Sequence, residues 1–216
     1  MTAELATRVV LADAAAILQA ARTLASGGLV AFPTETVYGL GADATNATAI
    51  ARLYAAKGRP SFNPLIAHVT SVAAARVLAA FDTAAEKLAA KFWPGPLTLV
   101  LRKRPDCPVA ELATAGLDTI AVRVPDHPIP LALLKAVGVP LATTSVNRSG
   151  QPPATSGPAA HKLFGTKVEW VIDGGTCHIQ EASSVVDLSS YPFTVIREGA
   201  IAKSQLEHVL LMKKGK

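Results

Sequence analysis

The sequence predicts an α/β domain of the α+β type, in which helices cover a mixed β-sheet. Capped, alanine-rich stretches alternate with short apolar runs along the chain, which is the pattern of helices packed on a sheet. Hydrophobic residues form 50% of the 216 residues, enough for a sizeable core. Short spacings between the last predicted strands favour hairpins, and therefore a sheet that is not purely parallel. We expect a single domain over 1–212 and a frayed basic tail over 213–216.

Each helix is predicted from a capping residue before an apolar-periodic stretch and from glycine or proline after it. Pro128 suits the first turn of the fifth helix, because its fixed φ and missing N–H do no harm there. The first two helices are expected to end at Gly27-Gly28 and at Gly58, and the helix that follows Asp82 is expected to end at Trp93-Pro94-Gly95-Pro96. In chain order, the expected helices follow Asp13, Asn46, Ser71 and Asp82 and then span His127–Val137 and Ser204–Met212.

Strands are predicted where short apolar or β-branched runs stand between turn residues. Leu29–Phe32 has the composition of a buried strand, and Pro33 closes it. After the strand at Leu141–Thr144, we expect a polar loop over Ser145–Pro158. The remaining strands are expected at Leu65–Val69, Leu97–Leu101, Thr119–Val124, Val168–Ile172, Ser184–Leu188 and Phe193–Arg197.

The composition excludes several classes of protein. No apolar run reaches the about 18 residues of a membrane span, and Met1–Val10 lacks a signal-peptide core, which leaves a cytoplasmic protein without a membrane partner as the expectation. Cys107 and Cys177 stand far apart, which disfavours a disulfide framework or a structural zinc site. The formal charge of +5 fits phosphate-bearing partners such as nucleotides or RNA. Aromatic residues are only 5%, too few for a stacking RNA platform.

The common catalytic motifs are missing from the sequence. It contains no P-loop, and Gly39-x-Gly41 has no third glycine at Ala44, so the dinucleotide-binding fingerprint fails. It also contains no nucleophile elbow, no paired histidine ligands and no paired carboxylates. Any chemistry must therefore come from polar residues at the ends of strands and in loops.

Two segments carry such residues early in the chain. The stretch Phe32–Gly41 leaves a buried strand through a glycine-punctuated turn, which can present hydroxyl and N–H groups to a ligand or serve only as a strand exit. In the next segment Lys57, Arg59 and Asn63 are held in a loop by two prolines. Arginine matches phosphate oxygens with its planar fork and lysine adds a mobile charge. The alternative is that both cations cap helical carbonyls and face water.

Arg123 lies within the otherwise apolar strand Thr119–Val124. A buried arginine needs an anionic partner, because an unpaired buried charge costs several kcal/mol. A free amino-acid carboxylate would satisfy it, and so would one of the 16 acidic residues of the chain. His68 ends a preceding strand, and a histidine there, taken alone, is more often a satisfied surface or core residue than a ligand-binding one.

Eight segments in order resemble the YrdC-like family of L-threonylcarbamoyladenylate synthases, in its short, single-domain form. They are FPTETVYGLG, KGRPSFNPL, IAHV, FWPGPLTLVL, TIAVRVP, SVN-x-SG, SSVVD and VIREGAI, and together they cover residues 10–210. The resemblance implies the YrdC/RibB-like fold, a twisted mixed sheet with a basic concave face. It also implies a nucleotidyltransferase that converts L-threonine, bicarbonate or CO2 and ATP to threonylcarbamoyl-AMP and pyrophosphate, for the N6-threonylcarbamoyl modification of tRNA beside the anticodon.

The resemblance further implies a role for each matching residue. Lys57 and Arg59 would be catalytic, through the charge they place beside the phosphates. L-Threonine would be bound by Thr36, His68, Arg123, Ser145 and Ser183, with its carboxylate on Arg123. ATP would be bound by Lys57, Arg59, Asn63, Thr119, Asn147, Thr155 and Arg197. No protein metal ligand is expected, and Mg²⁺ would enter with the phosphates of ATP. Separate threonylcarbamoyl-transferase proteins would act downstream, and tRNA is a further expected partner.

Two departures from the family pattern bear on these roles. Thr143-Thr144-Ser145-Val146-Asn147 stands where A-P-S-A-N is usual, and Ala182-Ser183-Ser184 stands where E-S-T is usual. Neither removes a side chain assigned above. Two other functions stay open: a tRNA- or double-stranded-RNA-binding module without catalysis, and a related enzyme acting on another carbamoyl or sugar-phosphate substrate.

Overall fold

The described part of the computed structural model, residues 7–148 and 150–211, forms one ten-stranded sheet of order β1-β8-β2-β3-β7-β4-β6-β5-β9-β10. Four neighbouring pairs, β1 with β8, β2 with β8, β4 with β6 and β5 with β9, are parallel, and the other five are antiparallel. The mixed sheet predicted from the sequence is therefore confirmed. The strands span Arg8–Leu11 (β1), Val30–Phe32 (β2), Gly39–Asp43 (β3), Ile66–His68 (β4), Leu97–Arg102 (β5), Thr119–Arg123 (β6), Leu141–Ser145 (β7), Trp170–Asp173 (β8), Ser184–Asp187 (β9) and Thr194–Arg197 (β10).

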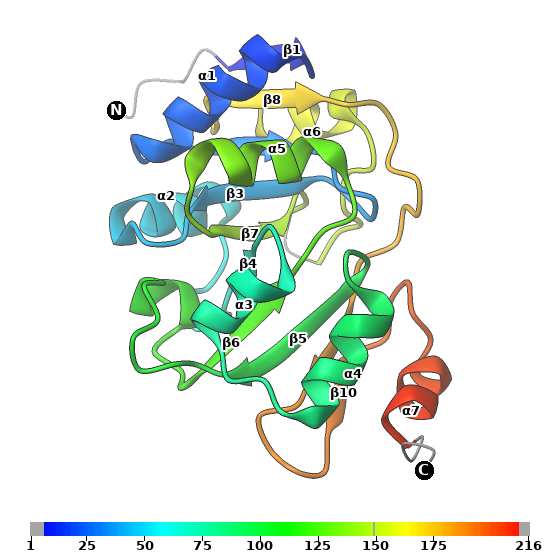
Figure 1. Ribbon diagram of the computed structural model, residues 1–216. Coiled ribbons are helices and arrows are strands. Elements are labelled where there is room, and N and C mark those ends of the chain that lie inside the picture. Colours follow the sequence, from blue (N-terminus) through cyan, green and yellow to red (C-terminus); the bar gives the residue numbers. More distant parts are fainter. Residues whose placement is uncertain (1–6, 149, 212–216) are drawn as a thin grey trace.

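Helices occupy the connections between these strands (Figure 1). The helix α1 lies at one end of the twisted sheet and α7 at the other. The helices span Ala14–Ala25 (α1), Ala47–Lys57 (α2), Val72–Leu78 (α3), Thr83–Phe92 (α4), Pro128–Val137 (α5), Gly157–Phe164 (α6) and Lys203–Leu211 (α7), with a 3-10 turn at Glu111–Thr114. No helix among these described residues is long and apolar enough to cross a membrane.

Two hydrophobic clusters lie on opposite faces of the sheet. On β2, Val30 and Phe32 join the cluster that includes α1 and α5, whereas Ala31 between them joins the cluster that includes α2, α3, α4 and α6. Successive side chains of a strand point to opposite faces, so this division assigns each cluster to its own face. The sheet is thus covered on both sides, and a polar site must lie where a helix leaves one face open.

The predicted helix caps are confirmed. Asp13, Asn46, Ser71 and Asp82 each accept a hydrogen bond from a backbone N–H in the first turn of the helix that follows. Gly58 ends α2 in the left-handed conformation, with φ of 62°, where a side chain would be strained. The predicted frayed tail at 213–216 and the residue Met212 lie outside the described residues.

Three expectations from the sequence are wrong. The Phe32–Gly41 stretch is not only a turn, because Gly39 begins β3, which pairs with both β2 and β7. The polar loop ends earlier than predicted, since Gly157 and Pro158 are already the first residues of α6. The strand β1 was not predicted at all; it has four residues and pairs in parallel with β8, about 160 positions away, as in the pair Arg8 and Trp170.

Candidate functional site

A pocket opens on the face of the sheet that carries Ile66 of β4 and Thr143 of β7. Register places Ala121 of β6 next to Ile66, and Arg123 next to His68 one step further along the same face. The adjacent residues of the strands, Ala67 and Val122, point into the opposite cluster. The pocket thus lies along β4, β6 and β7, and it is closed at the side by the Thr34–Val37 loop and by Ala182 and Ser183 before β9.

Arg123 is buried at one end of this pocket and is tied to the Thr34–Thr36 loop. Its Nη2 donates to Glu35 Oε1 at 2.7 Å and to Thr36 Oγ1 at 2.9 Å, and its Nε donates to the Gly95 carbonyl at 3.2 Å. Within the described residues its Nη1 has no hydrogen-bond partner. The internal ion pair considered from the sequence therefore exists, and one nitrogen of the fork is left for a ligand.

His68 lies beside Arg123 and is buried in the same pocket. Burial, and then the charge of Arg123, hold the pKa of His68 well below its usual value. The imidazole is therefore neutral at neutral pH, and its buried Nδ1 has no hydrogen-bond partner among the described residues. A neutral histidine with an unused ring nitrogen can bind a polar group without adding charge.

Lys57 holds the loop after β7. Its Nζ donates to the Ser145 carbonyl and to Asn147 Oδ1, and Ser145 Oγ donates to the same Oδ1 at 2.7 Å. Burial, and then the nearby charge of Arg59, lower the pKa of Lys57 to about 8. Lys57, Ser145 and Asn147 thus form one contact group at the end of the pocket away from His68, because Ser145 follows Thr143 on β7 and β7 runs antiparallel to β4.

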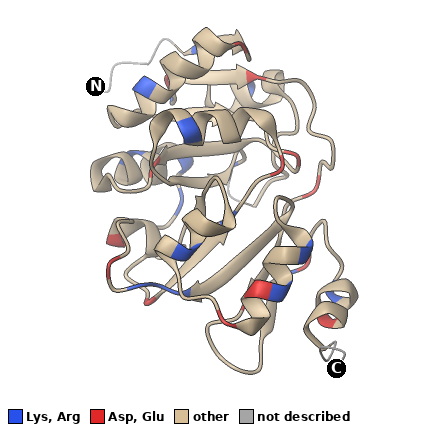
Figure 2. Ribbon diagram, viewed as in Figure 1, with Lys and Arg blue, Asp and Glu red and all other residues tan. Residues whose placement is uncertain are grey.

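Arg59 is held by its own loop. Its Nε donates to the Asn63 carbonyl and its Nη2 to the Pro64 carbonyl, both at 3.1 Å. Lys57 is the last residue of α2 and Arg59 lies in the loop that follows, and part of the chain that leaves α2 is blue in Figure 2. Burial lowers the pKa of Arg59, although an arginine stays charged at neutral pH. The guanidinium is thereby fixed beside the pocket before any ligand arrives.

Arg197 reaches the pocket from β10, the edge strand. Its Nε and Nη2 donate to the Ser183 carbonyl at 3.0 and 2.8 Å, and Ser183 Oγ is 2.9 Å from Thr98 Oγ1. Burial lowers the pKa of Arg197, and the charges of Arg123 and Arg59 lower it further. Three arginines from separate parts of the chain therefore converge on one pocket, where they repel one another and favour an anion.

The structure brings most of the predicted site residues together. Thr36, His68, Arg123, Ser145, Ser183, Arg59 and Arg197 line the pocket, and Lys57 and Asn147 contact Ser145 behind it. Asn63 and Thr119 are outside the lining but adjoin it, because the β4–β6 register, continued by one step from Ile66 and Ala121, places Pro64 next to Thr119.

Thr155 is the predicted residue whose place in the site is least defined. It is outside the pocket lining, and its backbone carbonyl accepts a hydrogen bond from Cys177 N at 2.8 Å. Among the described residues its side chain makes no hydrogen bond.

Sequence reasoning missed Glu35 and Thr34. Glu35 is buried, pairs with Arg123, and has a second oxygen, Oε2, with no partner in the described part of the chain. Thr34 Oγ1 lies 2.8 Å from Thr36 Oγ1 and donates to the Val37 carbonyl at 2.7 Å, which fixes the loop that presents Thr36. An acid flanked by threonines after a buried strand was the available signal.

Comparison with known proteins places these features in context. The Sua5/YciO/YrdC family model, described by the words telomere recombination, matches residues 22–199. The threonylcarbamoyl-AMP synthase of Pyrococcus abyssi is 46% identical over 192 residues, which are 88% of this chain and 56% of that protein. The Bacillus subtilis enzyme of the same name is 44% identical over 196 residues, 90% of this chain and again 56% of the relative.

A solved structure agrees with these sequence matches. The crystal structure of P. abyssi Sua5 complexed with L-threonine superposes with a TM-score of 0.88 at 43% identity, covering 95% of this chain and 60% of that one. This chain therefore spans little more than half the length of these relatives.

Proposed function

The chain belongs to the Sua5/YciO/YrdC family, and on that premise we propose that it is a threonylcarbamoyl-AMP synthase. It would join L-threonine, bicarbonate and ATP to give threonylcarbamoyl-AMP and pyrophosphate, which makes it a nucleotidyltransferase. The observation that carries the proposal is the convergence of Arg59, Arg123 and Arg197 on one pocket, with Glu35 as the paired acid. Such a pocket suits a ligand with a carboxylate at one end and a polyphosphate at the other.

The end formed by Arg123 and His68 would bind L-threonine. The free Nη1 of Arg123 is available to the substrate carboxylate, while Glu35 and Thr36 keep the guanidinium plane fixed. A fixed fork loses less side-chain entropy on binding than a mobile one. The neutral ring of His68 and the hydroxyl of Ser183 would meet the amine and hydroxyl of the amino acid, and Ser145, which lies toward the Lys57 end of the pocket, would reach the amino acid from that side.

The opposite end would bind ATP. Arg59 and Arg197 would neutralise phosphate oxygens, and Lys57 would release Asn147 or share it as it turns toward them. Asn63, Thr119, Asn147 and Thr155 are retained as further ATP ligands of this proposal. P. abyssi Sua5 was solved with L-threonine, which supports L-threonine as one of the two ligands proposed for this pocket.

The reaction proposed needs positioning and charge neutralisation more than a protein nucleophile. The neutral threonine amine adds to CO2 derived from bicarbonate and gives up a proton to water, and the resulting carbamate oxygen attacks the α-phosphorus of ATP. The bond from that phosphorus to the β-phosphate oxygen breaks, and pyrophosphate leaves with the electron pair. Lys57, Arg59 and Arg197 would stabilise the charge on the phosphates during this displacement.

Mg²⁺ fits this site as a companion of ATP. Within the described residues no group of three or more His, Cys, Asp or Glu could hold a metal ion, so the phosphates themselves would be its main ligands, completed by water. When bound, Mg²⁺ would supply additional neutralisation of phosphate charge. The protein's share is then to hold the phosphates on Arg59, Arg197 and Lys57.

The product is a mixed anhydride, which a separate transferase can use as an acyl donor. We therefore retain threonylcarbamoyl-transferase proteins and tRNA as downstream partners, and the cytoplasm as the compartment, within this proposal. A pyrophosphate-release assay tests it, because release should require ATP, L-threonine and bicarbonate together. Release that persists when either threonine or bicarbonate is omitted would contradict it.

Arg59→Ala sharpens this test. The variant should slow pyrophosphate release at least tenfold while the melting temperature changes little, because the Arg59 side chain bonds, among the described residues, only within its own loop. Arg76→Ala is the matched control, since Arg76 lies on α3 and pairs with Glu86 outside the pocket. A parallel loss of activity and melting temperature in Arg59→Ala would indicate a structural role instead.

A further inference from the structure

One carboxylate oxygen of Glu35 is buried without being used by the site. Oε1 accepts from Arg123 Nη2 at 2.7 Å, whereas Oε2 has no hydrogen-bond partner in the described part of the chain. Glu35 is outside the pocket lining and Oε2 is shielded from water, so this oxygen faces the interior and not a ligand. Because a buried polar atom without a partner is uncommon, the groups on that side of Glu35 are of interest.

The start of α5 lies against the loop that carries Glu35. Ile129, in the first turn of α5, belongs to the same hydrophobic cluster as Phe32 at the end of β2. Ile129 and Pro33 also meet at Gly174, because a Cβ on that glycine would lie 2.5 Å from Ile129 Cδ1 and 2.7 Å from Pro33 Cγ. Glu35 follows Pro33 by two positions, so the first turn of α5 and the Glu35 loop are neighbours in the fold.

His127 is the N-cap of α5, and it caps the helix with its imidazole. Nδ1 accepts a hydrogen bond from Ile129 N at 3.2 Å. A ring nitrogen that accepts carries no proton, so the proton of the neutral ring is on Nε2. Protonation would turn Nδ1 into a donor, and it would place a cation at the positive end of the helix dipole. The cap therefore exists only while His127 is neutral.

The surroundings of His127 act on its charge in opposite directions. Burial lowers the pKa of His127, and the carboxylates of Glu35 and Asp126 raise it by less. The helix that packs on α5, α1, carries Arg22 as its single charged residue, and that side chain is exposed. Asp173, at the end of β8, bonds to a tyrosine hydroxyl and to a backbone N–H. Glu35 is thus the charged group that links His127 to the pocket.

We propose that His127 is a positioning residue for Arg123 and acts through Glu35. This rests on the proposed function, in which Arg123 holds the carboxylate of L-threonine. In its neutral form, His127 fixes the start of α5 against the Glu35 loop, and Glu35 keeps the guanidinium in the orientation that leaves Nη1 available. In its protonated form, the imidazolium loses the cap and attracts the unpartnered Oε2, which draws the carboxylate away from Arg123.

The affinity for L-threonine should therefore decrease as the pH falls. Threonine binds best while His127 is neutral, so its Kd rises below a pH of about 6.5, the ordinary pKa of a histidine side chain. L-Threonine itself keeps the same charge in this range. His68, the histidine that lines the pocket, stays neutral, because burial holds its pKa well below the usual value. The pH dependence of threonine binding then reports His127.

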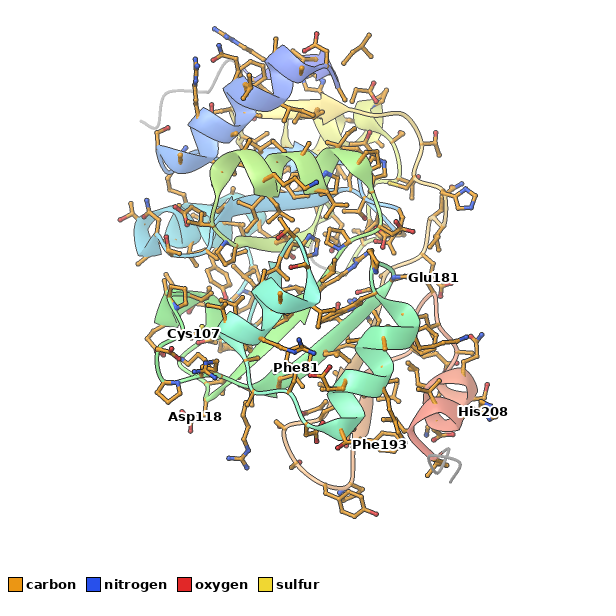
Figure 3. All side chains as sticks on the ribbon, viewed as in Figure 1. Phe81, Cys107, Asp118, Glu181, Phe193 and His208 are labelled. Atoms are coloured by element: carbon orange, nitrogen blue, oxygen red, sulfur yellow. The ribbon has the colours of Figure 1, made fainter. Side chains whose placement is uncertain are left out.

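Titration calorimetry with L-threonine at about pH 7.5 and about pH 5 tests this role. The Kd of the native protein should rise about fivefold between the two. His127→Asn should match the native Kd at the higher pH and show no pH dependence, because asparagine caps a helix without titrating. His127→Ala, which has no cap, should bind about fivefold more weakly at both. His208→Asn is the control and should keep the native pH dependence, since Figure 3 shows His208 on α7, away from α5.

Three results would overturn the role of His127: a native Kd that is the same at both pH values, an equal pH dependence in His127→Asn, or native affinity in His127→Ala. Should His127→Ala fail to fold, the comparison of the native protein with His127→Asn still decides the question. If the native protein does not bind L-threonine at all, the proposed function falls together with this inference. Threonine binding that is indifferent to pH removes this inference alone.

Discussion

Glu35 and Arg123, 88 positions apart, form a buried ion pair in which Arg123 Nη2 donates to Glu35 Oε1 at 2.7 Å. The pair joins the loop after β2 to the end of β6, and both side chains are almost fully shielded from water. It holds the guanidinium in one orientation while Nη1 stays available. The acid thus prepares the arginine for a second, incoming carboxylate.

Removing the Glu35 carboxylate should lower the stability of the fold. Glu35→Ala leaves the Arg123 charge buried without its partner, and we expect the free energy of unfolding to fall by about 3 kcal/mol. Urea denaturation measures this. Glu111→Ala is the control, because that exposed carboxylate pairs with Lys103 and should matter by less than about 1 kcal/mol. Similar, small losses in both variants would show that the buried pair does not stabilise the fold.

Binding of ATP should weaken above pH 8. The pKa of Lys57 is lowered to about 8 by burial and by Arg59, so the ammonium is charged below that pH and loses its proton above it. A neutral amine attracts phosphate less, and the Kd for ATP should therefore rise as the pH rises from 8 to 9.5. In Lys57→Arg the charge persists over this range, and the Kd should be flat. The same pH dependence in both proteins would exclude Lys57 as its source.

Gly41 should tolerate no side chain. A Cβ at this position of β3 would lie 2.6 Å from the Phe32 ring, inside van der Waals contact, and Gly41→Ala should lower the unfolding free energy by about 1–3 kcal/mol. Shortening the ring in Phe32→Leu should reduce the effect of the alanine, which a double-mutant cycle would detect. Additive losses in the two single variants would mean that the strands separate to accommodate the methyl group.

Asp82, the capping residue of α4, should contribute to the stability of the fold. Ser156, which stands at the same position before α6, should not. Asp82 accepts from Ala85 N at 2.8 Å, and Asp82→Ala should cost about 1 kcal/mol. Ser156 stands at the same position before α6 but makes no capping hydrogen bond, so Ser156→Ala should be close to neutral in thermal denaturation. An Asp82→Ala protein as stable as Ser156→Ala would refute the assignment.

Short sequence signals such as helix caps predict those features of the fold that depend only on neighbouring residues. Asn46 and Gly58 identify both ends of α2, because a cap and a left-handed glycine act within one helical turn. The strand β3 escaped prediction because Gly39 and Gly41 have no strand preference; the strand exists because β2 and β7 pair with it from both sides. Pro158, which the sequence predicts in a loop, occupies the first turn of α6, where proline is favoured.

The residues of the candidate site can also be divided into those that the sequence identifies and those that only the fold reveals. The residues that bear chemistry, such as Arg59 and Arg123, could be identified from their types and surroundings. Their partners could not, because the choice of Glu35 among the acids of the chain depends on how β2 and β6 are arranged in the sheet.

The most direct test of the proposed synthesis uses ¹³C-bicarbonate with ATP, Mg²⁺ and L-threonine, followed by mass spectrometry. We predict a threonylcarbamoyl-AMP peak that gains one mass unit relative to the unlabelled reaction and disappears when threonine is omitted. A well-folded protein that binds ATP and threonine but forms no such adduct would contradict the account and leave a binding function for this pocket.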